Sequence, residues 1–393
     1  MTLNAVIPLA LYVHLPWCVR KCPYCDFNSH AVKTSIPEED YIDALIRDLE
    51  AELPLVWGRS LESIFIGGGT PSLFSADAIN RLLSELRARL NMRPNLEITL
   101  EANPGTVEQD HFIGYRQAGI NRISLGVQSF SETSLKALGR IHGADESRQA
   151  FATARQAGFE NINIDLMFGL PAQSREAALE DLQIALSLGS EHLSWYELTL
   201  EPNTLFARFP PTDLPDDEEL WEMQAAGQQL LAAQGFEQYE VSAYSRAKQQ
   251  CRHNLNYWEF GDYIGIGSGA HGKISSPATD TVIRRVKPRQ PEAYLRAFSG
   301  KTSDQEAAEI VSQRTLNHAD LSFEFMLNAL RLQKPVPKSL FSERTGLPIK
   351  VIAKEINQAI ERDLLEETPT HWNATPLGRR FLNDLTGLFL KDH

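Results

Sequence analysis

The sequence is short of cysteine and of positive charge, and it contains no long apolar segment. It has four cysteines among 393 residues, and its formal net charge is −13. Non-specific binding to nucleic acid requires a positive surface, so this charge argues against a nucleic-acid partner. No stretch approaches the roughly 18 consecutive apolar residues of a membrane-spanning helix. Residues 1–10 have neither the basic nor the apolar segment of a signal peptide, and the sequence therefore predicts a cytoplasmic protein.

The few cysteines are unevenly placed. Cys18, Cys22 and Cys25 lie close together, whereas Cys251 is far away in the chain. Thiols stay reduced in the cytoplasm, where clustered cysteines indicate metal binding or catalysis more often than disulfides. The three neighbouring cysteines are therefore the first candidate for a functional site.

The first half of the chain repeats a predicted strand followed by a predicted helix. Each strand is a short β-branched or aromatic run, and an amphipathic helix follows it. Ser75, Ser131 and Ser174 are placed to cap three of these helices at their N-termini. Such alternation predicts a parallel sheet. The six predicted strands are Leu9–Leu15, Ser63–Gly68, Leu96–Glu101, Arg122–Val127, Asn161–Met167 and His192–Leu200.

The positions of polar residues distinguish between two architectures for this sheet. A doubly wound sheet gathers its ligands at one crevice, whereas a barrel collects them at the ends of many strands. Here polar or glycine-rich segments follow nearly every predicted strand, from the cysteine loop after the first to Glu197 and Glu201 near the sixth. The sequence therefore predicts an α/β fold with a partial (β/α)6 TIM-like barrel.

The second half loses this repeat. We expect the barrel at 1–205, a barrel extension at 206–308 and a C-terminal α-rich, winged-helix-like domain at 309–393. Gly261–Gly272 is predicted as a turn and strand that closes the barrel mouth, and 273–308 as mixed loop and helix. The acidity of the chain favours packing or partner docking over DNA binding for the last domain. Its predicted elements are helices at Phe323–Leu332, Lys338–Thr345, Val351–Arg362 and Pro376–Leu388 and a strand at His371–Ala374.

Three thiolates in one loop can hold three corners of a cubane iron–sulfur cluster. The loop runs from Cys18 through Cys22 to Cys25 and contains no fourth cysteine. The fourth iron of a [4Fe-4S] cluster would stay open to an exchangeable ligand, such as the amino and carboxylate groups of a methionine. A zinc site made by the three cysteines and His30 is the alternative. The glycine-rich turn and the polar strand ends favour the cluster, because a structural zinc loop needs neither.

The C-x3-C-x2-C spacing of the loop resembles the signature of the radical S-adenosylmethionine superfamily. With the flanking segment Tyr12–Cys18, the sequence is similar to the branch that contains oxygen-independent coproporphyrinogen III oxidases and haem chaperones. The resemblance covers nearly the whole chain. It implies a [4Fe-4S] cluster on Cys18, Cys22 and Cys25, with S-adenosylmethionine as a second cofactor.

A glycine-rich turn, Gly67–Pro71, follows the second predicted strand. Glycine lets the backbone approach a ligand closely, and in the superfamily this segment contacts the methionyl end of the cofactor. Carboxylates and an amide at other strand ends suit ribose hydroxyls and the ammonium group, and an arginine suits the carboxylate. The resemblance implies contacts with S-adenosylmethionine at Tyr12, Gly68, Gly69, Thr70, Glu101, Gln128, Arg140 and Asp165.

Two features separate this chain from the oxidases of the same branch. Phe27 stands where the oxidases have a further cysteine. Only 17 residues precede Cys18, so the N-terminal extension of the oxidases is missing. Both differences favour the chaperones.

A third feature is the match to the H-N-x-x-Y-W motif of the haem chaperones, which places haem contacts at His253, Asn254, Tyr257 and Trp258. Imidazole binds haem iron, and aromatic rings pack on porphyrin faces. Cys251 and His271 are reserve iron ligands.

The resemblance thus implies a protein that binds haem and delivers it to acceptor haemoproteins, with no catalytic residue assigned. The alternative is a coproporphyrinogen III oxidase-like enzyme that cleaves S-adenosylmethionine and abstracts hydrogen from a porphyrinogen side chain. The sequence leaves a homodimer open.

Overall fold

Six parallel strands form the centre of the computed structural model, which describes residues 2–3, 5–105, 109–300 and 310–390. They are β1 (Leu9–Leu15), β4 (Ser60–Gly68), β5 (Asn91–Ala102), β6 (Arg122–Gln128), β7 (Ile162–Phe168) and β8 (His192–Glu197). Each strand pairs in parallel with the next one in this order. The six predicted strands and the partial (β/α)6 barrel are confirmed.

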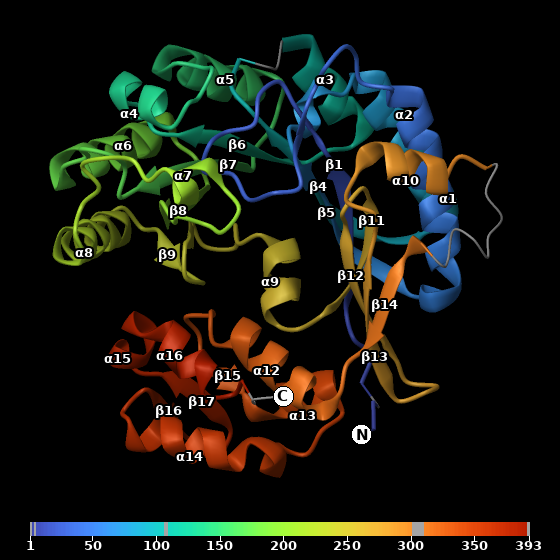
Figure 1. Ribbon diagram of the computed structural model, residues 1–393, viewed down its shortest axis with the longest axis vertical. Coiled ribbons are helices and arrows are strands. Elements are labelled where there is room, and N and C mark those ends of the chain that lie inside the picture. Colours follow the sequence, from blue (N-terminus) through green and yellow to red (C-terminus); the bar gives the residue numbers. More distant parts are fainter. Residues whose placement is uncertain (1, 4, 106–108, 301–309, 391–393) are drawn as a thin grey trace.

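Helices cover the outer face of these strands (Figure 1). They are α1 (Glu38–Val56), α2 (Ala76–Arg89), α3 (Gln109–Ala118), α4 (Glu132–Ala137), α5 (Ala144–Gln156) and α6 (Arg175–Leu188). The side chains of Ser75, Ser131 and Ser174 cap α2, α4 and α6 as predicted, each accepting a backbone N–H three residues further on. These caps fix where the helices begin, so the preceding loops stay at the carboxyl ends of the strands.

The sheet continues beyond β1, where two predictions are wrong. Gly261–Gly272 does form a strand, but the strand lies beside β1 and widens the sheet instead of closing the mouth. Residues 273–308, predicted as loop and helix, contain further strands. Lys287 forms buried ion pairs with Asp48 and Glu52 of α1, and these long-range contacts fasten the extension to the barrel. The extension comprises β11 (Asp262–Gly267), β12 (His271–Ser276), β13 (Thr281–Val286), α10 (Pro291–Ala297) and β14 (Ser312–Thr315).

At the other edge, two short antiparallel strands follow β8. They are β10 (Ala243–Ser245) and β9 (Glu237–Gln238), preceded by α7 (Leu205–Arg208) and α8 (Asp217–Ala233). Helix α9 (Arg252–Trp258) comes next and lies between the barrel strands and the C-terminal domain (Figure 1). This short helix carries the predicted haem contacts.

The predicted C-terminal module is present and has its own hydrophobic core. Phe325, Phe341 and Trp372 pack edge to face at its centre, and Leu3 and Ile7 of the N-terminal segment join them. The module contains α12 (His318–Ala329), α13 (Lys338–Thr345), α14 (Ala353–Glu361), α15 (Pro376–Arg380) and α16 (Leu382–Gly387) with β15 (Val336–Pro337), β16 (Leu365–Glu367) and β17 (His371–Ala374).

The barrel and its extension share the larger hydrophobic core, which runs from Leu9 to Val311. The domain boundaries at 205 and 308 stay predictions. Within the described ranges, no helix is long and apolar enough to cross a membrane.

Candidate functional site

A cavity of about 1170 Å³ opens at the carboxyl ends of the six parallel strands. It brings together the three cysteines and nearly all the residues predicted to contact S-adenosylmethionine. These lining residues are Cys18, Cys22, Cys25, Gly68, Gly69, Thr70, Glu101, Gln128, Arg140 and Asp165. Tyr12 is not among them. Its ring packs beside those of Phe65 and His253.

Each thiol of the cysteine loop has a polar neighbour. The Thr70 hydroxyl donates to Cys18 Sγ at 3.5 Å, and Arg140 Nη1 donates to Cys22 Sγ at 3.6 Å. The hydroxyl oxygen of Ser29 lies 3.8 Å from Cys25 Sγ. Polar neighbours of this kind orient cysteine ligands and stabilise their thiolates once a metal binds.

The fourth ligand of the zinc alternative points elsewhere. His30 Nε2 lies 3.2 Å from the main-chain oxygen of Arg289 and 3.3 Å from Asn28 Oδ1. His30 does not line the cavity in the part of the chain that the structure describes. Among the described residues, no group of three or more His, Cys, Asp or Glu side chains is arranged to hold a single metal ion.

The glycine-rich turn forms backbone hydrogen bonds with the segment that leads into the cysteine loop. Gly69 N–H donates to the oxygen of Leu15 at 2.8 Å, and Thr70 N–H donates to that of Trp17 at 2.7 Å. A Cβ atom on Gly69 would lie 2.5 Å from the Trp17 oxygen, and Gly68 has a φ of 124°. Glycine is therefore required at Gly69 because there is no room for a Cβ atom, and at Gly68 because of its positive φ. The hydrogen bonds of the turn fix the backbone just before Cys18.

Two carboxylates, Glu101 of β5 and Asp165 of β7, line the cavity on either side of β6. Burial, and to a lesser extent the nearby Asp165, raises the pKa of Glu101 to about 8, although the Gly68 N–H donates to Glu101 Oε2 at 3.0 Å. Burial also raises the pKa of Asp165, against hydrogen bonds from Asn163 and Ser124. A cationic ligand would offset the cost of burying these two groups together.

Arg140 and Gln128 line the same cavity, and Gln128 ends β6, the strand between the two that carry the carboxylates. Arg140 Nη2 donates to Asn103 Oδ1 at 2.8 Å and to the Gly126 oxygen at 2.7 Å. Its buried Nε has no hydrogen-bond partner among the described residues. Gln128 has a φ of 71°, and Tyr196 donates to its side-chain oxygen at 2.7 Å. Strained backbone at a cavity rim is typical of functional sites.

Comparison with known proteins accounts for this arrangement. Residues 12–184 match the model of the Radical SAM superfamily, and residues 316–381 match that of the HemN C-terminal domain. The protein called "Heme chaperone HemW" from Escherichia coli (strain K12) is 50% identical over 385 residues, which is 98% of this chain and 99% of that protein. The protein of the same name from Bacillus subtilis (strain 168) is 33% identical over 385 residues, which is 96% of this chain and 98% of that protein. The chain belongs to the HemW family of radical SAM proteins.

The fold of the family extends to the oxidase. The solved structure of coproporphyrinogen III oxidase (HemN) from Escherichia coli superposes with a TM-score of 0.81 at 22% identity, over 98% of this chain and 90% of that one. At this identity the match supports the fold alone. The zinc alternative is set aside, because the radical SAM domain implies a [4Fe-4S] cluster and S-adenosylmethionine. Three thiols, two half-buried carboxylates and an arginine with an unpartnered Nε form a donor set that fits both groups.

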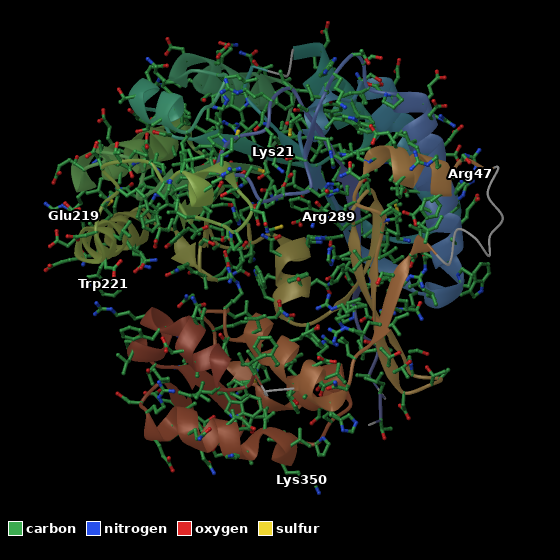
Figure 2. The ribbon with its side chains drawn as sticks, in the orientation of Figure 1. Lys21, Arg47, Glu219, Trp221, Arg289 and Lys350 are labelled. Carbon is green, nitrogen blue, oxygen red and sulfur yellow. The ribbon has the colours of Figure 1, made fainter. Side chains whose placement is uncertain are left out.

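The sequence analysis missed the wall of the cavity that the C-terminal domain supplies. Arg379, Arg380 and Phe381 line this wall, and Trp221 of α8 faces them. The guanidinium carbon of Arg380 lies 4.4 Å from the centroid of the Trp221 ring, and Figure 2 shows Trp221 at the edge of α8 that faces the C-terminal domain. No local pattern signals this pair, because the two residues are far apart in the sequence.

Helix α9, which carries the predicted haem contacts, is held at both ends. At its N-terminus, Glu97 of β5 accepts the N–H groups of Arg252 and His253 at 3.1 and 3.2 Å. At its C-terminus, Lys334 forms an ion pair with Glu259 at 2.5 Å, and Arg344 donates to the Glu259 main-chain oxygen at 3.3 Å. Negative charge at the start of a helix and positive charge at its end match the helix dipole.

His253 itself is buried, with 9% of its surface exposed. Its Nδ1 lies 3.1 Å from the Ser63 hydroxyl oxygen, and its ring packs against Phe65. Burial, with a smaller effect from Arg122, lowers the pKa of His253 to about 3, which keeps the imidazole neutral at physiological pH. Asn254, Tyr257 and Trp258 are half-buried. The reserve ligands are apart from them, since Cys251 lies buried against Glu97 and His271 is exposed on β12.

A chain of hydrogen bonds joins the cavity to the start of α9. Asn163 Nδ2 donates to Asp165 Oδ1 at 2.7 Å, and Asn163 Oδ1 lies 2.6 Å from His192 Nδ1. His192 Nε2 lies 2.8 Å from the Tyr239 hydroxyl, which accepts the Cys251 N–H at 3.4 Å. Burial lowers the pKa of His192 well below its usual value, and the acceptor on Asn163 assigns the imidazole proton to Nδ1. The cavity and α9 thus share one buried polar core.

Proposed function

We propose that this protein is a haem chaperone, which binds haem and transfers it to acceptor haemoproteins while carrying a [4Fe-4S] cluster and S-adenosylmethionine. The observation that carries this proposal is the near full-length identity of 50% to a protein named as a haem chaperone. The H-N-x-x-Y-W motif on α9 supports it, because the motif lies where the barrel meets the C-terminal domain.

We assign the cluster to Cys18, Cys22 and Cys25, and the S-adenosylmethionine contacts to the predicted residues of the cavity. Their shared cavity supports the assignment. Tyr12 is assigned a packing role, since its ring contacts Phe65 and it is not among the residues that line the cavity. No catalytic residue is assigned.

We assign the haem contacts to His253, Asn254, Tyr257 and Trp258. The lowered pKa of His253 supports this, because only a neutral imidazole offers a lone pair to iron. Because His253 is buried, haem cannot reach it without a structural change. Its bond to iron requires α9 to move relative to Ser63 and Phe65, so haem binding includes a local rearrangement. The two half-buried aromatic residues would pack on the porphyrin. The interaction with acceptor haemoproteins, the cytoplasmic location and a homodimer stay predictions.

The test is a haem titration of the cluster-loaded protein, followed by addition of an apo-haemoprotein. We expect wild type to bind haem and pass it on, and His253→Ala to lose or shift the Soret band while keeping the cluster absorbance. Tyr257→Ala and Trp258→Ala should weaken binding less, because they supply packing and not the iron bond. His318→Ala is the matched control, since His318 is exposed and lies at the start of α12, outside α9.

The competing function is the oxidase. Conversion of coproporphyrinogen III at a catalytic rate, together with haem binding that is indifferent to His253, would replace the chaperone proposal with an enzyme.

A further inference from the structure

Arg331, two residues after the end of α12, connects the haem motif to the cavity. Its guanidinium carbon lies 4.4 Å from the centroid of the Trp258 ring. The same side chain lines the cavity that holds the three cysteines. Arg331 is therefore a residue of the C-terminal domain that touches both α9 and the large cavity.

The hydrogen-bonding capacity of Arg331 is largely unused. Its buried Nε has no hydrogen-bond partner among the described residues, and the same holds for the indole nitrogen of Trp258. Its Nη2 forms an ion pair with Glu240 Oε2 at 3.6 Å, a separation longer than that of a hydrogen bond. A guanidinium has five N–H donors, so Arg331 retains donors for a ligand even with Glu240 nearby.

The surrounding wall is cationic and aromatic in an acidic protein. Arg379 and Arg380 also line the cavity, as does the acidic Asp384. The guanidinium of Arg380 lies over the rings of Trp221 and Phe381, which line the cavity too. The volume of about 1170 Å³ exceeds the roughly 300–1,000 Å³ of an ordinary small-molecule pocket. Such a wall suits a flat apolar ligand with negatively charged substituents.

We propose that Arg331 binds a propionate carboxylate of haem that packs against Trp258. The proposal rests on the proposed function and adds a residue outside the H-N-x-x-Y-W motif. Haem joins an apolar ring to two carboxylates, so a porphyrin at Trp258 brings a carboxylate within reach of a guanidinium that touches the same ring. Arginine matches a carboxylate with two parallel hydrogen bonds, which lysine cannot do.

The test compares haem with haem dimethyl ester, in which both carboxylates are blocked, on the cluster-loaded full-length protein. We expect wild type to bind haem about 10- to 100-fold more tightly than the ester, as for a hydrogen bond to a charged group. Arg331→Gln should lose most of this preference while binding the ester as wild type does. Arg331→Lys should keep part of it. Arg362→Gln is the control, because Arg362 is an exposed arginine of the same domain.

The outcomes separate the two proposals. Wild type that binds neither compound refutes the chaperone function. Wild type that binds both equally, or Arg331→Gln that still prefers haem, overturns the role of Arg331 and leaves the chaperone function standing. Far-ultraviolet circular dichroism and the cluster absorbance check that each variant is folded. If the glutamine variant is not, the preference measured on Arg331→Lys decides, since an undiminished preference there overturns the role.

Discussion

Replacing Glu97 with alanine removes the carboxylate that holds the start of α9. Its two oxygens accept the N–H groups of Arg252 and His253 at 3.1 and 3.2 Å, and Cys251 Sγ lies 3.5 Å away. Loss of a helix cap costs about 0.5–2 kcal/mol, and a buried donor left without a partner costs about 1–3 kcal/mol. Because the site is buried, we expect Glu97→Ala to lower the free energy of unfolding by about 2–4 kcal/mol.

The assay has a global and a local part. Chemical denaturation gives the change in the free energy of unfolding, and hydrogen exchange of the amides in 252–258 reports on α9 itself. Glu97→Gln should lose less than alanine, because it retains one acceptor oxygen. Glu160→Ala is the control, since Glu160 is exposed. If Glu97→Ala unfolds with a free energy within about 0.5 kcal/mol of wild type, and hydrogen exchange in α9 is unchanged, then Glu97 does not cap α9.

Three further predictions concern the cavity. Cys22→Ala should abolish the [4Fe-4S] cluster, measured as iron and sulfide after anaerobic reconstitution, while Cys251→Ala leaves it intact; tightly held zinc without sulfide would contradict this. Arg140→Ala should weaken S-adenosylmethionine binding by about 1.5–3 kcal/mol in calorimetry, and an unchanged affinity would remove Arg140 from the site. The pKa of about 8 at Glu101 means that the folded state holds a proton which the unfolded state loses near pH 4.5. Stability from this group is therefore full below about pH 4.5 and falls as the pH rises to about 8. Glu101→Gln should flatten that decline in denaturation at several pH values without S-adenosylmethionine, and an identical profile would show that Glu101 ionises normally.

The sequence by itself determined the elements whose signals are local. Serine caps, hydrophobic periodicity and β-branched runs depend on neighbours along the chain, and the six parallel strands and three caps are where these patterns place them. The cysteine loop is equally local, because three ligands within one turn need no distant partner. Residues at the strand ends converge because parallel strands place their carboxyl ends at one edge of the sheet, which explains why most of the cavity residues were predictable.

Tertiary structure decided what depends on distant segments. The sheet extends beyond β1 because β11 pairs with it, and buried ion pairs join Lys287 to α1; both contacts link segments that are far apart in the sequence. The burial of His253 follows from the docking of α9 on Ser63 and Phe65, and its cap comes from Glu97, more than a hundred residues earlier. The contact of Arg331 with Trp258 likewise exists only once the C-terminal domain packs on α9. Sequence patterns reveal what a residue type can do, but the packing of domains determines which partners it meets.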